Sequence, residues 1–165
     1  MRYEQELRNA RSYGEIFDMV KRIVFDYCGR DQAGLMLGLS DLGGNSEQYV
    51  GAFYLLHGNM IIINKRPIQR ILQTNPSLYN PYIFHVLLHE YIHSLGIMDE
   101  TMCRQLTYDI SYKYFGGNHI ITQLAQNITK FMPHLTYAPD NFLAPKDMNI
   151  EFISGFDRSN TNYIM

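Results

Sequence analysis

Hydrophobic residues in the first half of the chain recur first at helical and then at strand-like spacing. The helical pattern begins behind Ser12 and Glu15, which form a capping-box signature, and it ends at Gly29. We therefore expect an amphipathic helix packed on a core. Three apolar runs follow at residues 33–39, 49–56 and 60–63. They predict at least three strands, and the turn His57-Gly58-Asn59 between the last two indicates a hairpin.

The second half of the chain has mainly helical patterns. One helix of about fifteen residues is expected to start at Asn80-Pro81 and to stop at Gly96, because Asn is a favoured N-cap, Pro suits the first turn and Gly tolerates the left-handed conformation. Weaker patterns predict further helices at residues 67–72, 100–115 and 119–132, the last opened by Asn118, and a strand at residues 149–153.

The helix expected before Gly96 carries His89, Glu90 and His93. Residues four apart on a helix share a face, so the two imidazoles can converge on one metal ion with Glu90 at its flank. Zinc suits this arrangement, because it accepts neutral imidazole nitrogens and keeps a position for water when three protein ligands are present. A flanking carboxylate can take a proton from that water, so peptide-bond hydrolysis is the reaction that this pattern serves best.

A third ligand must come from outside the two helical turns that hold the histidines. Gly96 allows the chain to turn back, so that Asp99 can approach the ion. Asp99 is also a favourable N-cap for the next helix, and both roles can coexist. Glu100 is the next candidate, since a shift of one residue would bring its longer side chain inward.

The segment His89-Glu90-x-x-His93-x-x-Gly96-x-x-Asp99 resembles the extended metzincin motif of the zincin metallopeptidases. Most metzincins have histidine at the last position, and the aspartate is similar to the snapalysin-type variant. The resemblance implies Zn²⁺ bound by His89, His93 and Asp99, with Glu90 as general base and a peptide or protein as substrate. The expected fold is α+β and zincin-like: a small twisted mixed sheet packed on an N-terminal helix and the motif helix, followed by a helical C-terminal part.

Other histidines and tyrosines are weaker candidates for the site. His85 lies eight residues before His93, which is about 12 Å along a helix axis, so one zinc ion cannot bind both; it is better interpreted as a packing residue or a partner of a ligand. His119 is a less favoured third ligand of the kind that Spartan-type proteases use. Tyr137 or Tyr163 can stabilise an oxyanion as in some zincins, although packing or surface placement is the more economical interpretation among 13 tyrosines.

Length, charge and cysteine content limit the alternatives. The 165 residues fit a single domain spanning residues 1–165, and a formal net charge of −2 disfavours nucleic acid as an obligatory partner. The charged N-terminus does not match a signal peptide and no apolar stretch reaches membrane-spanning length, so we expect a cytoplasmic protein without a membrane partner. Cys28 and Cys103 are expected to be reduced, buried thiols.

The sequence thus predicts a zinc metallopeptidase. The alternative is a catalytically inactive metal-binding or interaction module on the same scaffold, in which the motif helix serves packing. The run at residues 60–63 precedes the motif helix as the substrate-pairing edge strand does in zincins, and a core strand is equally consistent with its composition.

Overall fold

The computed structural model describes residues 2–42, 49–55, 58–139 and 142–157. The α-helices are α1 (Arg2–Asn9), α2 (Tyr13–Cys28), α3 (Lys65–Thr74), α4 (Tyr79–Ser94), α5 (Glu100–Phe115) and α6 (Ile120–Gln126), with 3₁₀ turns at Pro76–Leu78 and Ile128–Lys130. The strands are β1 (Met36–Ser40), β2 (Tyr49–Val50), β3 (Ala52–Leu55), β4 (Met60–Asn64), β5 (Leu135–Thr136) and β6 (Glu151–Ile153). The expected α+β class is confirmed.

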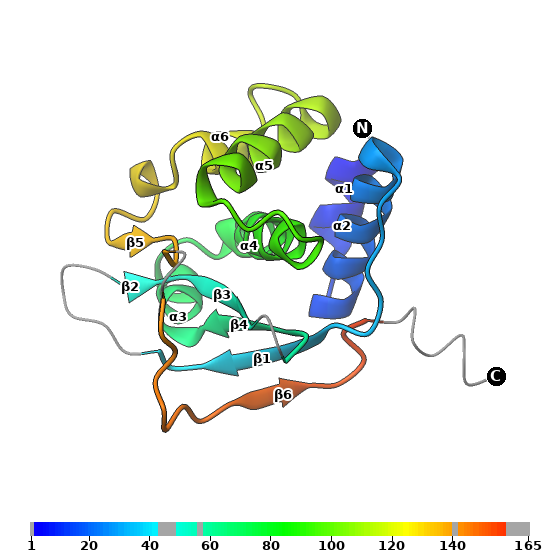
Figure 1. The fold of residues 1–165 in the computed structure, drawn as a ribbon. Coiled ribbons are helices and arrows are strands. Elements are labelled where there is room, and N and C mark those ends of the chain that lie inside the picture. Colours follow the sequence, from blue (N-terminus) through cyan, green and yellow to red (C-terminus); the bar gives the residue numbers. More distant parts are fainter. Residues whose placement is uncertain (1, 43–48, 56–57, 140–141, 158–165) are drawn as a thin grey trace.

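The main sheet is mixed and has the strand order β3-β4-β1-β6. Strands β1 and β4 are parallel, whereas β3 pairs antiparallel with β4 and β6 pairs antiparallel with β1. A separate parallel pair joins β2 to β5. Helix α4 lies between the main sheet and the pair α5 and α6, and α2 packs along its side (Figure 1).

Helix α4 is enclosed on every side. All residues from 82 to 92 are buried, and α4 contacts α2, α5, α6, β3 and β4. A helix that is apolar around its whole circumference is stable only inside a core, and most of these buried residues are apolar. His85, His89 and Glu90 are exceptions to this composition. The fold therefore holds titratable groups in its interior, at the centre of its most buried helix.

The C-terminal segment covers the face of the sheet that points away from α4. Phe53, Met60 and Ile62 form a second small core with Ala138, Phe142, Ala144, Met148 and Ile150. Gly38 in β1 permits this packing, because a Cβ atom at that position would lie 2.5 Å from Cγ2 of Ile150. Strand β4 is consequently buried on both faces, as expected for an interior strand.

A buried carboxylate fixes the end of the described chain. Asp157 accepts hydrogen bonds from the backbone N–H groups of Gly34 (2.9 Å) and Leu35 (3.3 Å), just before β1. The ammonium of Lys21 in α2 lies 3.2 Å from the same carboxylate. The C-terminal segment, the start of β1 and α2 are thus joined at one point.

Several predicted boundaries are confirmed. Ser12 caps α2 by accepting the N–H of Glu15 (3.1 Å), and Gly29 ends it at φ 70°. Helix α5 has the predicted bounds, Gly96 follows α4 with φ 99°, and β6 falls inside the predicted strand at residues 149–153. The antiparallel β3–β4 pair confirms the hairpin, although His57 lies outside the described residues.

Other expectations are wrong in detail. Asn80 is not an N-cap: α4 begins at Tyr79, and the Asn80 amide donates to the carbonyls of Leu7 (2.8 Å) and Ala10 (3.0 Å) at the end of α1. Helix α6 is capped by His119 rather than by Asn118 and stops at Gln126. The strand at 60–63 is the interior strand β4, so the core-strand interpretation holds, and the edges of the main sheet are β3 and β6.

The two cysteines differ in exposure. Cys103 is buried as expected, Cys28 is exposed, and the two are not paired. None of the helices in the described part of the chain has both the length and the apolarity needed to cross a membrane.

Truncating Leu87 should test the enclosure of α4, because Leu87 is fully buried and lies on the opposite side of the helix from His89, two residues away. Leu87→Ala should lower the free energy of unfolding by about 2–5 kcal/mol in urea titrations. Leu72→Ala is the matched control, since Leu72 in α3 is 51% exposed, and it should cost less than about 1 kcal/mol. Equal costs would contradict a buried α4.

Candidate metal centre

A tight reversal between α4 and α5 brings the two helices face to face. Gly96 adopts φ 99°, a left-handed conformation that suits glycine, and α5 begins four residues later. The reversal also orients one imidazole: Nδ1 of His93 lies 2.8 Å from the carbonyl oxygen of Ile97. When Nδ1 donates its hydrogen there, the neutral ring keeps a lone pair at Nε2, which is the form that binds a metal.

The carboxylate of Glu100 lies between the two histidines of α4. Its Oε2 is 3.3 Å from Nε2 of His89 and 3.3 Å from Nε2 of His93. Its Oε1 is 2.5 Å from Nε2 of His89, yet this buried atom has no partner with hydrogen-bond geometry among the described residues. Neighbouring ligands of one tetrahedral zinc ion lie about 3.3 Å apart, and Oε2 has this distance to each of the two Nε2 atoms. We refer to His89, His93 and Glu100 together as the donor triad.

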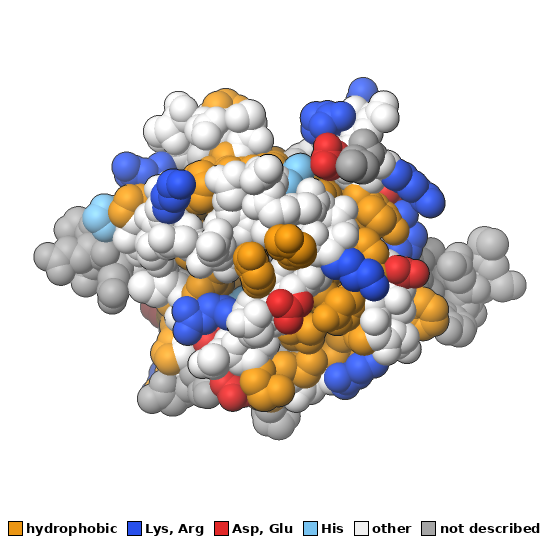
Figure 2. Space-filling view, turned by 90° about the horizontal axis from the view of Figure 1, so that it is seen from above, with side chains coloured by type: hydrophobic (Ala, Val, Ile, Leu, Met, Phe, Trp, Pro, Cys, Tyr) orange, Lys and Arg blue, Asp and Glu red, His pale blue; other side chains and the backbone are white. Residues whose placement is uncertain are grey.

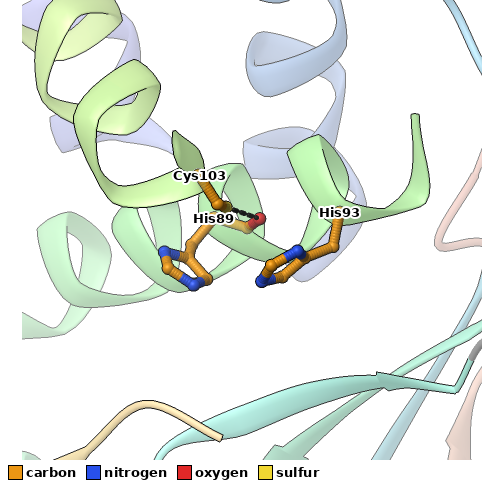
Figure 3. A group of neighbouring side chains, drawn as sticks. All are labelled: His89, His93 and Cys103. Atoms are coloured by element: carbon orange, nitrogen blue, oxygen red, sulfur yellow. Dashed lines mark hydrogen bonds between the residues drawn. The ribbon is translucent and has the colours of Figure 1, made fainter. Parts of the chain in front are cut away.

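Cys103 lies one turn beyond Glu100 on the same face of α5. Ligand atoms of Cys103, His89 and His93 all lie within 4.8 Å of one another. The Cys103 thiol donates to the carbonyl oxygen of His89 at 3.2 Å, so it reaches the backbone of α4 at the residue that carries the first imidazole (Figure 3). His89 and His93, four residues apart on α4, thus face two residues that lie three apart on α5, Glu100 and Cys103.

Asp99 occupies the N-cap position of α5. Its carboxylate accepts the N–H of Thr101 at 3.0 Å, and the residue is exposed. This is the capping role that the sequence offered as an alternative to metal binding. The structure therefore brings Glu100, and not Asp99, against the two histidines, which favours Glu100 as the candidate third ligand. His119 caps α6 through Nδ1, which accepts the N–H of Ile121, and packs on Phe115, outside the donor triad.

Glu90 lies beside the donor triad, where it lines a cavity together with His93 and Glu100. The other walls come from β3, through Phe53 and Tyr54, and from Met98, Ala138, Pro139 and Phe142. Glu90 is 5% exposed, and burial raises the pKa of its carboxyl group, with an opposing effect from the two neighbouring imidazoles. A carboxylate with a raised pKa is suited to accepting a proton near neutral pH.

Tyr137 packs against His89 and orients its imidazole. Its ring stacks on the imidazole of His89, with centroids 4.5 Å apart and an interplanar angle of 18°. Its hydroxyl lies 2.9 Å from Nε2 of His85, and burial lowers the pKa of His85 to about 3, so His85 is a neutral partner of this hydroxyl. His85 is thus buried beside Tyr137 and His89, in agreement with its interpretation as a packing residue. The proposed oxyanion role of Tyr137 remains a prediction, and Tyr163 lies outside the described residues.

The donor groups strongly influence one another's protonation. Burial alone would lower the pKa of His89 and of His93, but the facing Cys103 and Glu100 outweigh it and raise both values. Burial would raise the pKa of Glu100, but the hydrogen bonds from the two imidazoles outweigh it and lower the value to about 2. The cluster thus combines an ionised carboxylate with basic imidazoles, and a cation that binds there must displace protons.

Comparisons of the chain with protein-family profiles, with curated proteins and with solved structures gave no significant match. The function must therefore be argued from the chemistry and geometry of the site itself.

Sequence reasoning assigned no functional role to Cys103. The available signal was the spacing Glu100-x-x-Cys103 at the start of a helix, which puts both side chains on one helical face. The position of Tyr137 was not predictable, because it depends on how the chain returns to α4 after α6.

Removing the Glu100 carboxylate should weaken metal binding far more than removing that of Asp99. We expect Glu100→Ala to raise the zinc dissociation constant by more than about 100-fold. Loss of a residue that only hydrogen-bonds to a metal ligand already lowers metal affinity about 10–100-fold. Asp99→Ala, the matched control, should lose only its cap, about 1 kcal/mol of stability. Chelator competition at equal folded fraction measures both variants, and the reverse ranking would return the ligand role to Asp99.

Proposed function

We propose that this protein is a zinc-dependent peptidase with a zincin-like active site. The observation that carries this proposal is the convergence of two helix-borne imidazoles and one carboxylate, with a second, buried carboxylate beside them in the wall of a cavity. The first three groups are the donor triad, and the second carboxylate is Glu90.

The donor triad fits zinc better than a hard cation. Neutral imidazole nitrogens and a carboxylate are zinc ligands, whereas Mg²⁺ and Ca²⁺ prefer oxygen donors throughout. Three protein donors also leave a coordination position open, which is typical of catalytic rather than structural zinc sites. The buried Oε1 of Glu100 has no hydrogen bond of good geometry among the described residues, and a bound cation would satisfy it.

Bound zinc would supply acidified water and a Lewis acid for the scissile carbonyl. Glu90 would act as general base: its carboxylate accepts a proton at the wall of the cavity and returns it to the leaving amine. The stacked Tyr137 ring and the Ile97 carbonyl hold the two imidazoles in fixed orientations. These contacts keep the site assembled before substrate arrives.

The surroundings of the cavity favour an extended peptide as substrate. Strand β3 is one of the two edge strands of the main sheet, and its residues Phe53 and Tyr54 line the cavity. An edge strand offers backbone N–H and C=O groups with which a peptide can pair. The apolar side chains of Phe53, Met98 and Phe142 would accept a hydrophobic substrate residue next to the scissile bond.

The protein surface gives no support for a polyanionic substrate on the face formed by α5 and α6. Among the described residues of that face, basic and acidic side chains are dispersed between apolar and neutral ones (Figure 2). Such a distribution lacks the continuous basic patch that nucleic-acid binding uses.

The purified protein should contain about one zinc ion per chain, because the donor triad forms one site. His89→Ala or His93→Ala should empty it, as measured by elemental analysis after dialysis against buffer. His134→Ala, at an exposed histidine, is the matched control and should retain the metal. A wild-type protein that takes up no zinc from a zinc-supplemented buffer would rule out the site.

Glu90→Gln should keep the fold and the zinc but lose most peptidase activity. The amide preserves the shape of the side chain and cannot accept the proton, which typically costs roughly 10²–10⁴-fold in rate. Wild type and variant are compared at matched zinc content on an unfolded protein and on a mixed peptide library.

Glu151→Gln provides the control for this substitution, because Glu151 is a largely exposed glutamate of β6, and it should retain full activity. Equal turnover by wild type and Glu90→Gln would show that the cleavage arises elsewhere, and the proposed mechanism would fail.

A further inference from the structure

Cys103 has an environment unlike that of an ordinary buried cysteine. It is fully buried, and small apolar thiols of that kind usually pack among hydrophobic side chains. Here the sulfur lies within 4.8 Å of ligand atoms of both His89 and His93. Its residue is also one helical turn from Glu100, so the thiol and the carboxylate extend from the same face of α5 towards α4.

The thiol is thus a potential fourth donor for the ion that the donor triad would hold. Zinc binds cysteine thiolate readily, at about 2.3 Å, and zinc sites with four protein ligands are closed, whereas catalytic sites keep one position open. Cys103 extends from α5 towards the imidazoles, close to the backbone of His89 (Figure 3). Rotation about its Cα–Cβ bond changes the direction of the sulfur without moving either helix.

We propose that Cys103 is a fourth protein ligand of the metal, and that its thiolate closes the site in the resting protein. The inference rests on the proposed zinc site and adds a form of regulation to it: the enzyme is latent while sulfur is bound. Binding breaks the S–H bond, releases the proton to solvent and forms a sulfur–zinc bond. Opening reverses this step, since the thiolate takes up a proton and restores its hydrogen bond to the His89 carbonyl.

The ligation is tested with the full-length protein loaded with Co²⁺ in place of zinc. A cysteine ligand gives a thiolate-to-cobalt charge-transfer absorption in the near ultraviolet, which nitrogen and oxygen ligands do not give. We expect this band in wild type, its loss in Cys103→Ala, and its retention in Cys28→Ala. Cys28 is the matched control, because it is a free thiol exposed at the end of α2.

A second measurement needs no variant and so does not depend on the folding of Cys103→Ala. X-ray absorption of the zinc-loaded wild type should show one sulfur scatterer at about 2.3 Å together with nitrogen and oxygen scatterers. A shell of nitrogen and oxygen alone, or a cobalt spectrum that Cys103→Ala leaves unchanged, would overturn the proposal.

The regulatory part is tested by activity. If the open form makes up about one tenth of the wild type, Cys103→Ala should raise the turnover of zinc-loaded protein about tenfold, whereas Cys28→Ala should leave it unchanged. Sulfur ligation with equal activity in wild type and Cys103→Ala would refute the latency. Sulfur ligation without activity in any variant would instead refute the peptidase function and leave the four-donor metal site standing. Activity in wild type without sulfur ligation would refute the fourth ligand and leave the peptidase function standing.

Discussion

The burial of α4 is the constraint on which the rest of the structure depends. A helix enclosed by a sheet on one side and by helices on the others must be apolar almost everywhere, and any polar group on it must find a partner inside the protein. Nε2 of His85 has the Tyr137 hydroxyl and Nε2 of His89 has the Glu100 carboxylate, whereas the buried Nδ1 atoms of both rings make no hydrogen bond to the described residues. The surrounding segments are therefore arranged around these buried groups as much as around the apolar core.

Two short spacings convert this burial into a candidate metal site. Histidines four apart on α4 present two nitrogens to one point, and a glutamate and a cysteine three apart on α5 present an oxygen and a sulfur to the same region. The reversal at Gly96 makes the two helical faces meet, and the return of the chain after α6 places Tyr137 against His89. Each contribution is local in sequence, but the convergence arises only when α5 packs on α4.

The sequence predicted the elements whose signals are local. Helix α2 has a capping box and a terminal glycine, α5 follows an aspartate cap, and β4 is an uninterrupted apolar run, so their positions were recoverable. It did not predict α1, which has one fully buried side chain, Leu7, or β5, which is two residues long and exists only by pairing with β2. The cap assigned to Asn80 failed because its amide serves a tertiary contact with α1 instead.

The candidate site likewise has one part that the sequence could predict and one part that it could not. The spacing of His89, Glu90 and His93 is a property of one helix and could be recognised without a structure. The third ligand could not be decided, since Asp99 and Glu100 are adjacent and the answer depends on where α5 starts. An aspartate that caps a helix points its carboxylate back at the helix N-terminus, and this directs the next side chain, that of Glu100, towards α4.

Glu90 is what distinguishes a catalytic site from a purely structural one. A closed metal centre is complete with the two imidazoles, the Glu100 carboxylate and the Cys103 sulfur, and it has no use for a further buried acid. Burial disfavours the charged form of Glu90 and raises the pKa of its carboxyl group, against the opposing effect of the two imidazoles. Glu90 is not needed as a metal ligand and lines a cavity next to an edge strand, and these two features support the proposed peptidase over a structural metal centre. Together with the proposed ligation by Cys103, this buried acid favours the hypothesis of a latent catalyst over that of a structural metal centre.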